Sequence, residues 1–306
     1  MDAKWRNSAG RDGEAGQIRA PGRAMGRLAK LFVLFVSLTG LGTWGCNAYA
    51  ATCTSTAAGG NWNAPATWTC VGVPVVTFPG QTDNAVIAGP GAVAVNVASR
   101  VNLLTVNSGA TLNVSTFQLR TYGLASISGT VNFTGVSASR FYLGVTIGAG
   151  GVWNNTGNST MSFRGGGITN NGGTFTAGTG IYTFQTAAQA IGGTSPITIP
   201  NITVTTIALT NNGTLTVPTS LAGTGSLVNA ATGTLNIGGT SAITTLTATA
   251  AGNTVNYNGA AAQTVKATTY SNLTLSGALA KTITTATTIV NGVLSMEGTA
   301  TASAVP

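Results

Sequence analysis

The chain has 306 residues, of which 43% are hydrophobic, 6% are charged and none is histidine. Seven of the 13 basic residues and three of the five acidic ones fall within the first thirty positions, so the six and two that remain leave residues 51–306 with a net charge of +4. This composition excludes catalytic sites built on histidine, and it makes the high isoelectric point weak evidence for nucleic-acid binding.

The N-terminal fifty residues have the pattern of an export signal. Residues 31–42 are an apolar run too short to span a bilayer, preceded by basic residues and followed by Ala48-Tyr49-Ala50. This order is typical of a secretory signal with an A-x-A cleavage site. We predict a leader and signal peptide over 1–50, with translation starting at Met1 or Met25, and a mature chain that is extracellular or on the outer cell surface. A membrane anchor is the alternative.

Residues 51–90 are predicted to form an N-terminal cap. They contain Cys53 and Cys70, which would pair in an oxidising compartment and stabilise the fold by about 3 kcal/mol. Two free thiols are the alternative. Trp62 and Trp68 flank a turn in the same segment. We interpret them as covering the open end of a core; stacking of a sugar on an indole is the other interpretation.

Residues 91–306 repeat a short strand motif with a period of about 20 residues. A glycine precedes an apolar strand at Gly109, Gly129, Gly151, Gly173, Gly213, Gly233 and Gly292. A unit of this size cannot bury its own apolar face, so the period indicates stacked coils. We predict an all-β fold, a right-handed parallel β-helix, with the side chains of Leu112, Val131, Leu215 and Leu235 inward. A β-sandwich is the alternative.

A longer internal repeat is also present. The segment 184–204, which contains Gln189, matches the segment 257–275, which contains Gln263. The match adds a second, longer repeat to the 20-residue period.

Two stretches carry a resemblance to known families. The spacing of Trp62, Pro65, Trp68, Pro74 and Asp83 resembles the G8-like N-terminal module of exported bacterial β-helix proteins. The segment that follows Gln263 is similar to repeats of adhesin-like and autotransporter-like passengers and of the large surface protein encoded with mannose-sensitive pilus genes.

The resemblance implies a secreted or cell-surface protein with a structural or adhesive role, whose partner is a host or matrix surface. No membrane barrel, adhesin tip or cell-wall anchor follows the repeats, and the last residues form no recognisable cap. We therefore expect a solenoid truncated at its C-terminus, and a chain that is a fragment of a larger exoprotein.

The residue types argue against catalysis. Glycoside cleavage normally needs two carboxylates about 5 to 9.5 Å apart. After residue 50 the only acids are Asp83 and Glu297, far apart in the sequence. We predict no catalytic residue, no metal site and no cofactor. A polysaccharide-active enzyme is a remote alternative, and a Ser-Lys pair at Lys266 or Lys281 is left open.

One set of charged residues shares a position in the repeat. It comprises Arg100, Arg120, Arg140 and Arg164, which lie nine, nine, eleven and nine residues before the glycine of their repeat, with Tyr122 and Tyr142 two residues beyond their arginines. Stacked coils would place neighbouring arginine Cα atoms about 4.8 Å apart. Guanidinium groups suit carboxylate, sulfate or phosphate, so we hypothesise a face that binds an acidic glycan or a lipopolysaccharide head group. Solvated charges that protect strand edges are the alternative.

Threonine pairs suggest one further activity. Thr-x-Thr pairs such as Thr203/Thr205 and Thr214/Thr216 are typical of ice-binding faces, which need a flat ladder that repeats on every coil. These pairs do not keep the 20-residue period. An ice-binding protein therefore remains a remote alternative.

Overall fold

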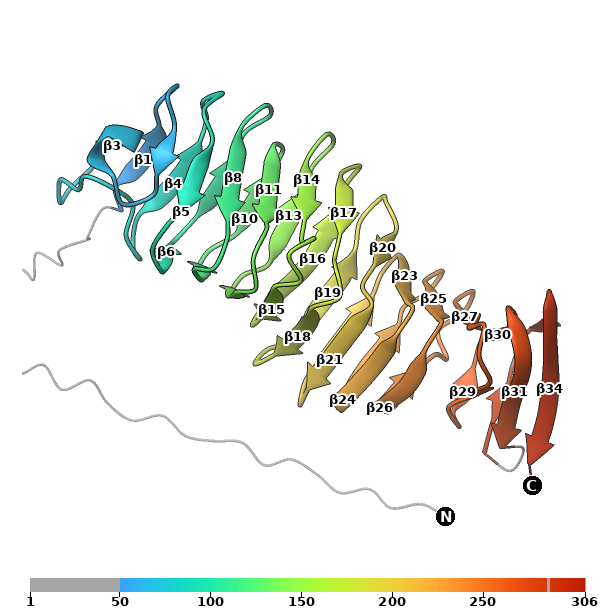
Figure 1. Cartoon of the computed structure of the whole chain (residues 1–306). Helices are drawn as coiled ribbons and strands as arrows, with labels where there is room; N and C mark the ends of the chain where they lie inside the picture. Colours follow the sequence, from blue (N-terminus) through green and yellow to red (C-terminus); the bar gives the residue numbers. More distant parts are fainter. Residues whose placement is uncertain (1–49, 285–286, 306) are drawn as a thin grey trace, which may run out of the picture. The chain divides into compact units, whose positions relative to one another are not determined.

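The structure is a computed structural model in which residues 50–284 and 287–305 are described. The predicted leader and signal peptide lie outside the described residues, apart from Ala50. The described part of the chain is all-β, without α-helix, and its strands stack in parallel as a β-solenoid of about 11 turns with coils about 20 residues apart. This confirms the predicted fold class (Figure 1).

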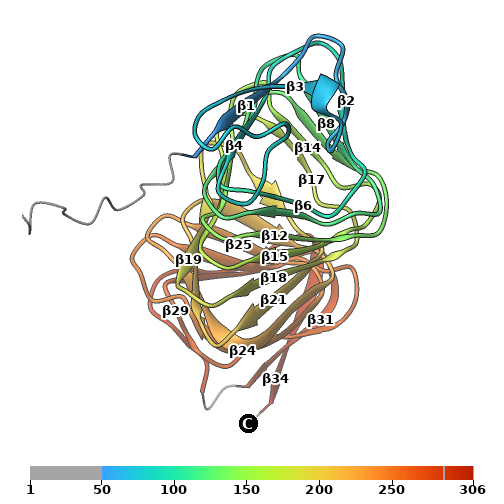
Figure 2. The same cartoon turned by 90° about the vertical axis from the view of Figure 1, so that its left-hand side faces the viewer.

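Each complete coil adds one strand or part of a strand to each of three faces. On the first face lie β6 (Ser99–Val101), β9 (Leu119–Thr121), β12 (Ala138–Phe141), β15 (Thr160–Phe163), β18 (Ile181–Gln185), β21 (Asn201–Thr205), the first parts of β24 (Ser220–Asn229) and β26 (Thr240–Thr247), and then β28 (Gln263–Thr264), β31 (Ala278–Thr284) and β34 (Thr299–Val305). Strands β12, β15, β18 and β21 follow one another on this face in Figure 2.

The second face continues each coil after the first. It holds β1 (Thr52–Ser55), β4 (Asn84–Ile87), β7 (Leu104–Val106), β10 (Ala125–Ile127), β13 (Val145–Ile147), β16 (Gly166–Asn170), β19 (Gln189–Gly192), β22 (Ala208–Asn211), the second parts of β24 and β26, β29 (Thr269–Tyr270) and β32 (Ile289–Val290).

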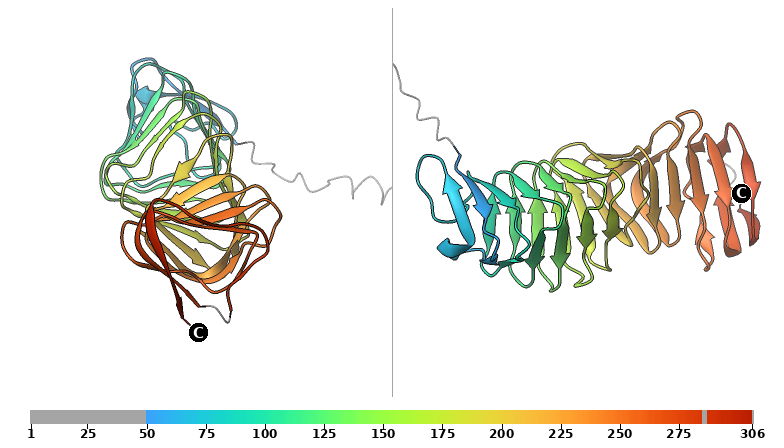
Figure 3. Two further views of the ribbon diagram at one scale, coloured as in Figure 1. Left: turned by 90° about the vertical axis from the view of Figure 1, so that its right-hand side faces the viewer. Right: turned by 90° about the horizontal axis from the view of Figure 1, so that it is seen from above.

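The third face closes each coil. It holds β2 (Gly60–Asn61), β5 (Val93–Val95), β8 (Thr111–Val114), β11 (Thr130–Phe133), β14 (Val152–Asn154), β17 (Thr174–Thr176), β20 (Ile197–Thr198), β23 (Thr214–Val217), β25 (Thr234–Ile237), β27 (Thr254–Tyr257), β30 (Asn272–Leu275) and β33 (Leu294–Met296). The stacking of all three faces can be followed in Figure 3.

Strand alternation builds the core. Successive side chains of a strand point to opposite faces, and the predicted inward residues Leu112, Val131, Leu215 and Leu235 are all at most 1% exposed, which confirms their placement. In the N-terminal half, Phe163 stacks between Phe141 and Phe184, with ring centroids 5.3 and 5.1 Å apart. The core is therefore a continuous column of apolar side chains inside the coils.

Buried asparagines satisfy the backbone at tight corners. The Asn211 amide donates to Asn229 Oδ1 at 2.8 Å, and the Asn229 amide donates to the carbonyls of Gly233 and, in the next coil, of Thr254 at 3.1 and 3.0 Å. Buried carbonyl groups need such partners. Glycine is required where coils approach closely: at Gly167 φ is +92°, and a Cβ would lie 1.9 Å from the Ala190 carbonyl oxygen.

The first coil is longer than the others because it contains the cap. A 3-10 turn, η1 (Pro65–Thr67), leads to β3 (Trp68–Val71), which runs antiparallel to β1. Parallel pairing nevertheless begins inside this segment, since β1 pairs with β4 and β2 with β5. Residues 51–90, predicted as a cap, therefore also contribute the first coil and the first strand of the second coil.

Candidate functional site

Three of the predicted arginines form one column on the first face. Arg100 is paired with Arg120 between β6 and β9, and Arg120 with Arg140 between β9 and β12. Parallel neighbouring strands lie about 4.8 Å apart, so the column carries one guanidinium per coil. Arg100 is exposed, and the other two are partly exposed. We call Arg100, Arg120 and Arg140 the arginine column.

Arg164 does not belong to this column, so the prediction of a four-residue ladder is wrong at its last member. Arg140 is paired with Ser162, and Phe141 with Phe163, which places Arg164 beside Tyr142. The cause is a change in turn length. Two residues join β10 to β11, whereas four join β13 to β14. Gly151 therefore lies two positions farther from the first face than Gly129 does, and counting back from the glycine no longer identifies the same column.

A second column runs beside the first and contains both predicted tyrosines. The rings of Tyr122 and Tyr142 are stacked, with centroids 4.7 Å apart and an interplanar angle of 18°. The Arg164 guanidinium carbon lies 5.4 Å from the Tyr142 ring centroid, which is a cation–π distance. Both faces of the Tyr142 ring are thus occupied, which leaves its edge for a ligand. We call Tyr122, Tyr142 and Arg164 the tyrosine column.

A neutral glutamine holds Arg120, and neither acid among the described residues forms a salt bridge with the arginines. The Arg120 Nε donates to Gln118 Oε1, and the Gln118 amide donates to the Ala138 carbonyl, so this guanidinium is tied to the next coil. The two acids of the described residues are engaged elsewhere: Asp83 accepts from the Ala51 and Gly80 amides, and Glu297 accepts from Ser295. The face therefore presents uncompensated positive charge.

A small hollow opens where the two columns meet. It has a volume of about 170 Å³, and its lining includes Arg140, Arg164, Ser162, Thr183 and Gln185. The Gln185 amide donates to Ser162 Oγ at 2.8 Å, which leaves the Ser162 hydroxyl hydrogen available. The Arg164 Nε is buried and has no hydrogen-bond partner among the described residues. Two cations and a hydroxyl donor thus surround a space of the size of one acidic group.

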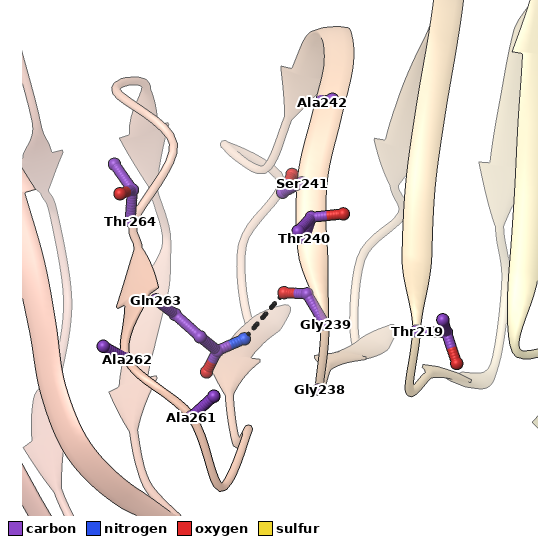
Figure 4. Close-up of a pocket in the computed structure, with 10 residues that line it drawn as sticks. All are labelled: Thr219, Gly238, Gly239, Thr240, Ser241, Ala242, Ala261, Ala262, Gln263 and Thr264. Carbon is purple, nitrogen blue, oxygen red and sulfur yellow. Dashed lines mark hydrogen bonds between the residues drawn. The ribbon is translucent and has the colours of Figure 1, made fainter.

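A larger hollow, of about 380 Å³, lies farther along the same face (Figure 4). It forms where the ladder breaks, because β28 pairs with β31 and not with β26. Eleven positions separate Ile237 from Ala248, but thirteen separate their partners Tyr257 and Tyr270, so this coil bulges.

The lining of this hollow is uncharged. It is made of Thr219, Gly238, Gly239, Thr240, Ser241, Ala242, Ala261, Ala262, Gln263 and Thr264. The Gln263 amide donates to the Gly239 carbonyl at 2.9 Å, the bond drawn in Figure 4. The lining residues offer hydroxyl and amide groups, but no side chain that could act as a general acid or base near neutral pH.

The sequence similarity between segments 184–204 and 257–275 has a structural basis. The Gln263 amide also donates to the Ile237 carbonyl at 2.8 Å, and the Gln189 amide donates to the Phe163 carbonyl at the same distance. In each case the acceptor is paired, in the preceding coil, with the aromatic residue that begins the repeated segment: Ile237 with Tyr257, and Phe163 with Phe184. Gln189 lies on the second face and Gln263 on the first, but the two glutamines make the same kind of bond between coils.

The cap residues are buried together at the N-terminal end. Cys53 and Cys70 are paired across β1 and β3 and form a disulfide, as predicted. Trp62 and Trp68 are 1% and 6% exposed, and their indole N–H groups donate to the carbonyls of Pro79 and Trp62. Because the indole faces are covered by protein, they are not surfaces on which a sugar could stack.

Lys281, a candidate for a Ser-Lys pair, bonds to carbonyl groups and a glutamine, and none of its hydrogen bonds goes to a serine. Its ammonium group is fully buried and donates to the Gly259 and Ala261 carbonyls and to Gln263 Oε1, at 2.7, 3.2 and 2.7 Å. Burial lowers the pKa of this lysine. Sequence reasoning missed its burial, because a lysine in an exposed repeat and a lysine in the core look alike in the pattern.

The register also reveals an array of small polar side chains that the search for Thr-x-Thr pairs does not find. Threonine and asparagine side chains form two outward columns on the third face, namely Thr214, Thr234, Thr254 and Asn272, and beside them Thr198, Thr216, Asn236, Asn256, Thr274 and Ser295. Of the predicted pairs only Thr214/Thr216 belongs to it. The sequence indicates this array through the motifs Gly-Thr-Leu-Thr at 213–216 and Gly-Thr-Leu-Asn at 233–236, in which the last residue is either threonine or asparagine.

Among residues 50–284 and 287–305, no three histidine, cysteine or acidic side chains lie close enough together to hold a metal ion. Within the same residues, no helix has the length and apolar character needed to cross a membrane.

Comparison of the chain with protein-family models, with curated proteins and with solved structures gives no match.

Proposed function

We propose that the chain is a secreted or cell-surface β-solenoid with a structural and adhesive role, and that it adheres to acidic glycans through the arginine and tyrosine columns. The proposal includes export by the N-terminal signal and assigns no catalysis and no cofactor. The resemblance to G8-like modules and to adhesin-like repeats belongs to this proposal. The target would be a host or matrix surface that displays acidic polysaccharide or lipopolysaccharide.

One observation carries the proposal, which is that Arg100, Arg120 and Arg140 are paired in register with no carboxylate beside them. Like charges on neighbouring strands are unfavourable, so the fold gains no stability from this arrangement. A polyanion would relieve the repulsion and form charge-assisted hydrogen bonds. Nucleic acid is not the proposed ligand, because the net charge of the solenoid is small.

The test is binding to a charged and a neutral glycan at low salt. We expect the full chain to bind an acidic polysaccharide and to ignore dextran, and we expect added salt to weaken binding because it screens charges. Changing Arg120 and Arg140 together to glutamine should weaken binding at least tenfold. Lys266→Gln, which removes a charge outside the two columns, is the matched control. Indifference of the unmodified chain to the acidic polysaccharide would end the proposal.

A second candidate function, ice binding, is favoured by the paired columns on the third face. Residues of one column lie about 4.8 Å apart, and the two columns are separated by about 6.8 Å, twice the rise per residue. These distances are close to the oxygen repeats on a prism face of ice. No charged residue interrupts the columns, and threonine is stiff at χ1. The Asn236 amide donates to Thr216 Oγ1 at 3.2 Å, which holds one link of the array in place.

Ice partitioning tests this candidate directly. The full chain should be enriched in slowly grown polycrystalline ice, and Thr234→Lys with Thr254→Lys should abolish the enrichment. Thr210→Lys, on an outward position of the second face, serves as the control and should leave the enrichment unchanged. Equal exclusion of all three forms from ice would refute the idea.

A further inference from the structure

The spacing of the arginine column points to a particular class of glycan. We propose that the ligand is a linear polyuronate with one carboxylate on every sugar ring, lying across the strands along the column, and that one of its carboxylates occupies the hollow between Arg140 and Arg164. This inference rests on the proposed function and specifies its ligand.

The arginines of the column are evenly spaced along it. The registers give one arginine per coil at Arg100, Arg120 and Arg140, without a gap, and coils lie about 4.8 Å apart. One pyranose ring lengthens a linear polysaccharide by nearly the same distance. A chain charged on every ring therefore meets a guanidinium at every charge, whereas a chain charged on every second ring leaves alternate arginines without a partner.

Two of the guanidinium groups are held in place by neighbouring side chains. The Arg120 Nε is bound to Gln118, and the Arg164 guanidinium lies over the Tyr142 ring, which is itself stacked on Tyr122. Held side chains lose less conformational entropy when they bind a ligand. The charge spacing of these two residues is thus set by the protein before a ligand arrives.

The hollow lies at the end of the arginine column. Ser162 continues the column where a fourth arginine was expected, and its small side chain leaves the space between Arg140 and Arg164 open. The free hydroxyl hydrogen of Ser162 and the guanidinium groups of Arg140 and Arg164, which line the hollow, supply donors for one carboxylate. Charge-assisted bonds of this kind are about twice as strong as neutral ones.

The experiment compares ligands that differ in charge spacing. We would measure affinity of the full chain for de-esterified polygalacturonate, for half-methylated polygalacturonate, for hyaluronan, which is charged on every second ring, and for dextran, all at one low salt concentration. We expect the de-esterified polymer to bind at least tenfold more tightly, per mole of carboxylate, than half-methylated polygalacturonate or hyaluronan, and dextran not to bind.

A pair of neutral substitutions tests the hollow. Ser162→Ala should weaken binding of de-esterified polygalacturonate about fivefold through loss of one hydrogen bond. Thr203→Ala, in the same column but outside the hollow, should leave it unchanged. Equal losses in both variants, or none in either, would remove the hollow from the binding site.

The outcomes separate this inference from the function on which it rests. Equal affinity per carboxylate for all three polyanions would overturn the polyuronate assignment and leave acidic-glycan binding in place. Failure of every polyanion to bind would overturn the proposed function itself. Binding that survives Arg120→Gln with Arg140→Gln would overturn both, because the ligand would then lie elsewhere.

Discussion

The first and the last described coils differ in how far their apolar side chains are buried. At the N-terminal end, Trp62 and Trp68 are buried and a disulfide joins β1 to β3. In the C-terminal coil, Val293, Leu294 and Met296 are 62%, 53% and 51% exposed. An apolar hollow of about 290 Å³ also opens there between Leu273, Ile283 and the last strand. Exposed side chains contribute less hydrophobic stabilisation than buried ones. The comparison predicts a gradient of local stability.

The largest expected effect tests that gradient in the core. Phe163→Ala, in the aromatic stack of the N-terminal half, should lower the free energy of unfolding by about 3 to 5 kcal/mol, because a fully buried ring leaves a cavity. Leu294→Ala, in the exposed coil, should cost less than about 1 kcal/mol. Urea denaturation followed by circular dichroism measures both. Similar costs at the two sites would contradict the gradient.

The disulfide should have the next largest effect, and a local one. Replacing Cys53 and Cys70 together by serine opens a loop with a sequence separation of 17, worth about 3 kcal/mol. Hydrogen exchange should speed up in β1, β3 and β4 and stay unchanged beyond β12. If exchange rises evenly along all coils instead, the cap acts on the whole solenoid and the ends are not independent.

Lys281 provides a pH-dependent test in the C-terminal part. Burial lowers the pKa of its ammonium group in the folded state, so the unfolded chain binds this proton more tightly. Stability should therefore rise with pH from the folded-state pKa up to the usual pKa of lysine. Lys281→Met should flatten the dependence of the urea midpoint on pH, whereas Lys266→Met should retain it. A slope that persists in Lys281→Met would assign the effect to another group.

The smallest effect is expected on the arginine column. Arg120→Gln with Arg140→Gln should leave thermal stability unchanged or raise it by less than about 0.5 kcal/mol, because like-charge repulsion is relieved. Any gain should vanish at high salt. A clear loss of stability would mean that these arginines support the fold of the N-terminal half and are not free to serve a ligand.

Sequence alone determined the architecture of this protein. Glycines near a 20-residue period and strands that alternate apolar and polar residues are local properties, and a unit too small to bury its own core has to stack. The inward positions of Leu112, Val131, Leu215 and Leu235 followed from the same alternation. The Cys53–Cys70 bond followed from two isolated cysteines in a chain with a predicted export signal.

Tertiary structure alone decided which side chains become neighbours across coils. From the second coil on, paired residues are separated by as few as 18 positions, as in Thr254 and Asn272, and by as many as 23, as in Val145 and Ile168. An insertion of two residues keeps a side chain on the same side of its strand but moves it by one column. Arg164 therefore joined the tyrosines, because register depends on the hydrogen-bond ladder between coils and not on distance along the chain. The threonine and asparagine columns keep the 20-residue spacing, but asparagine stands at 236 and 256, so the Thr-x-Thr pattern does not repeat.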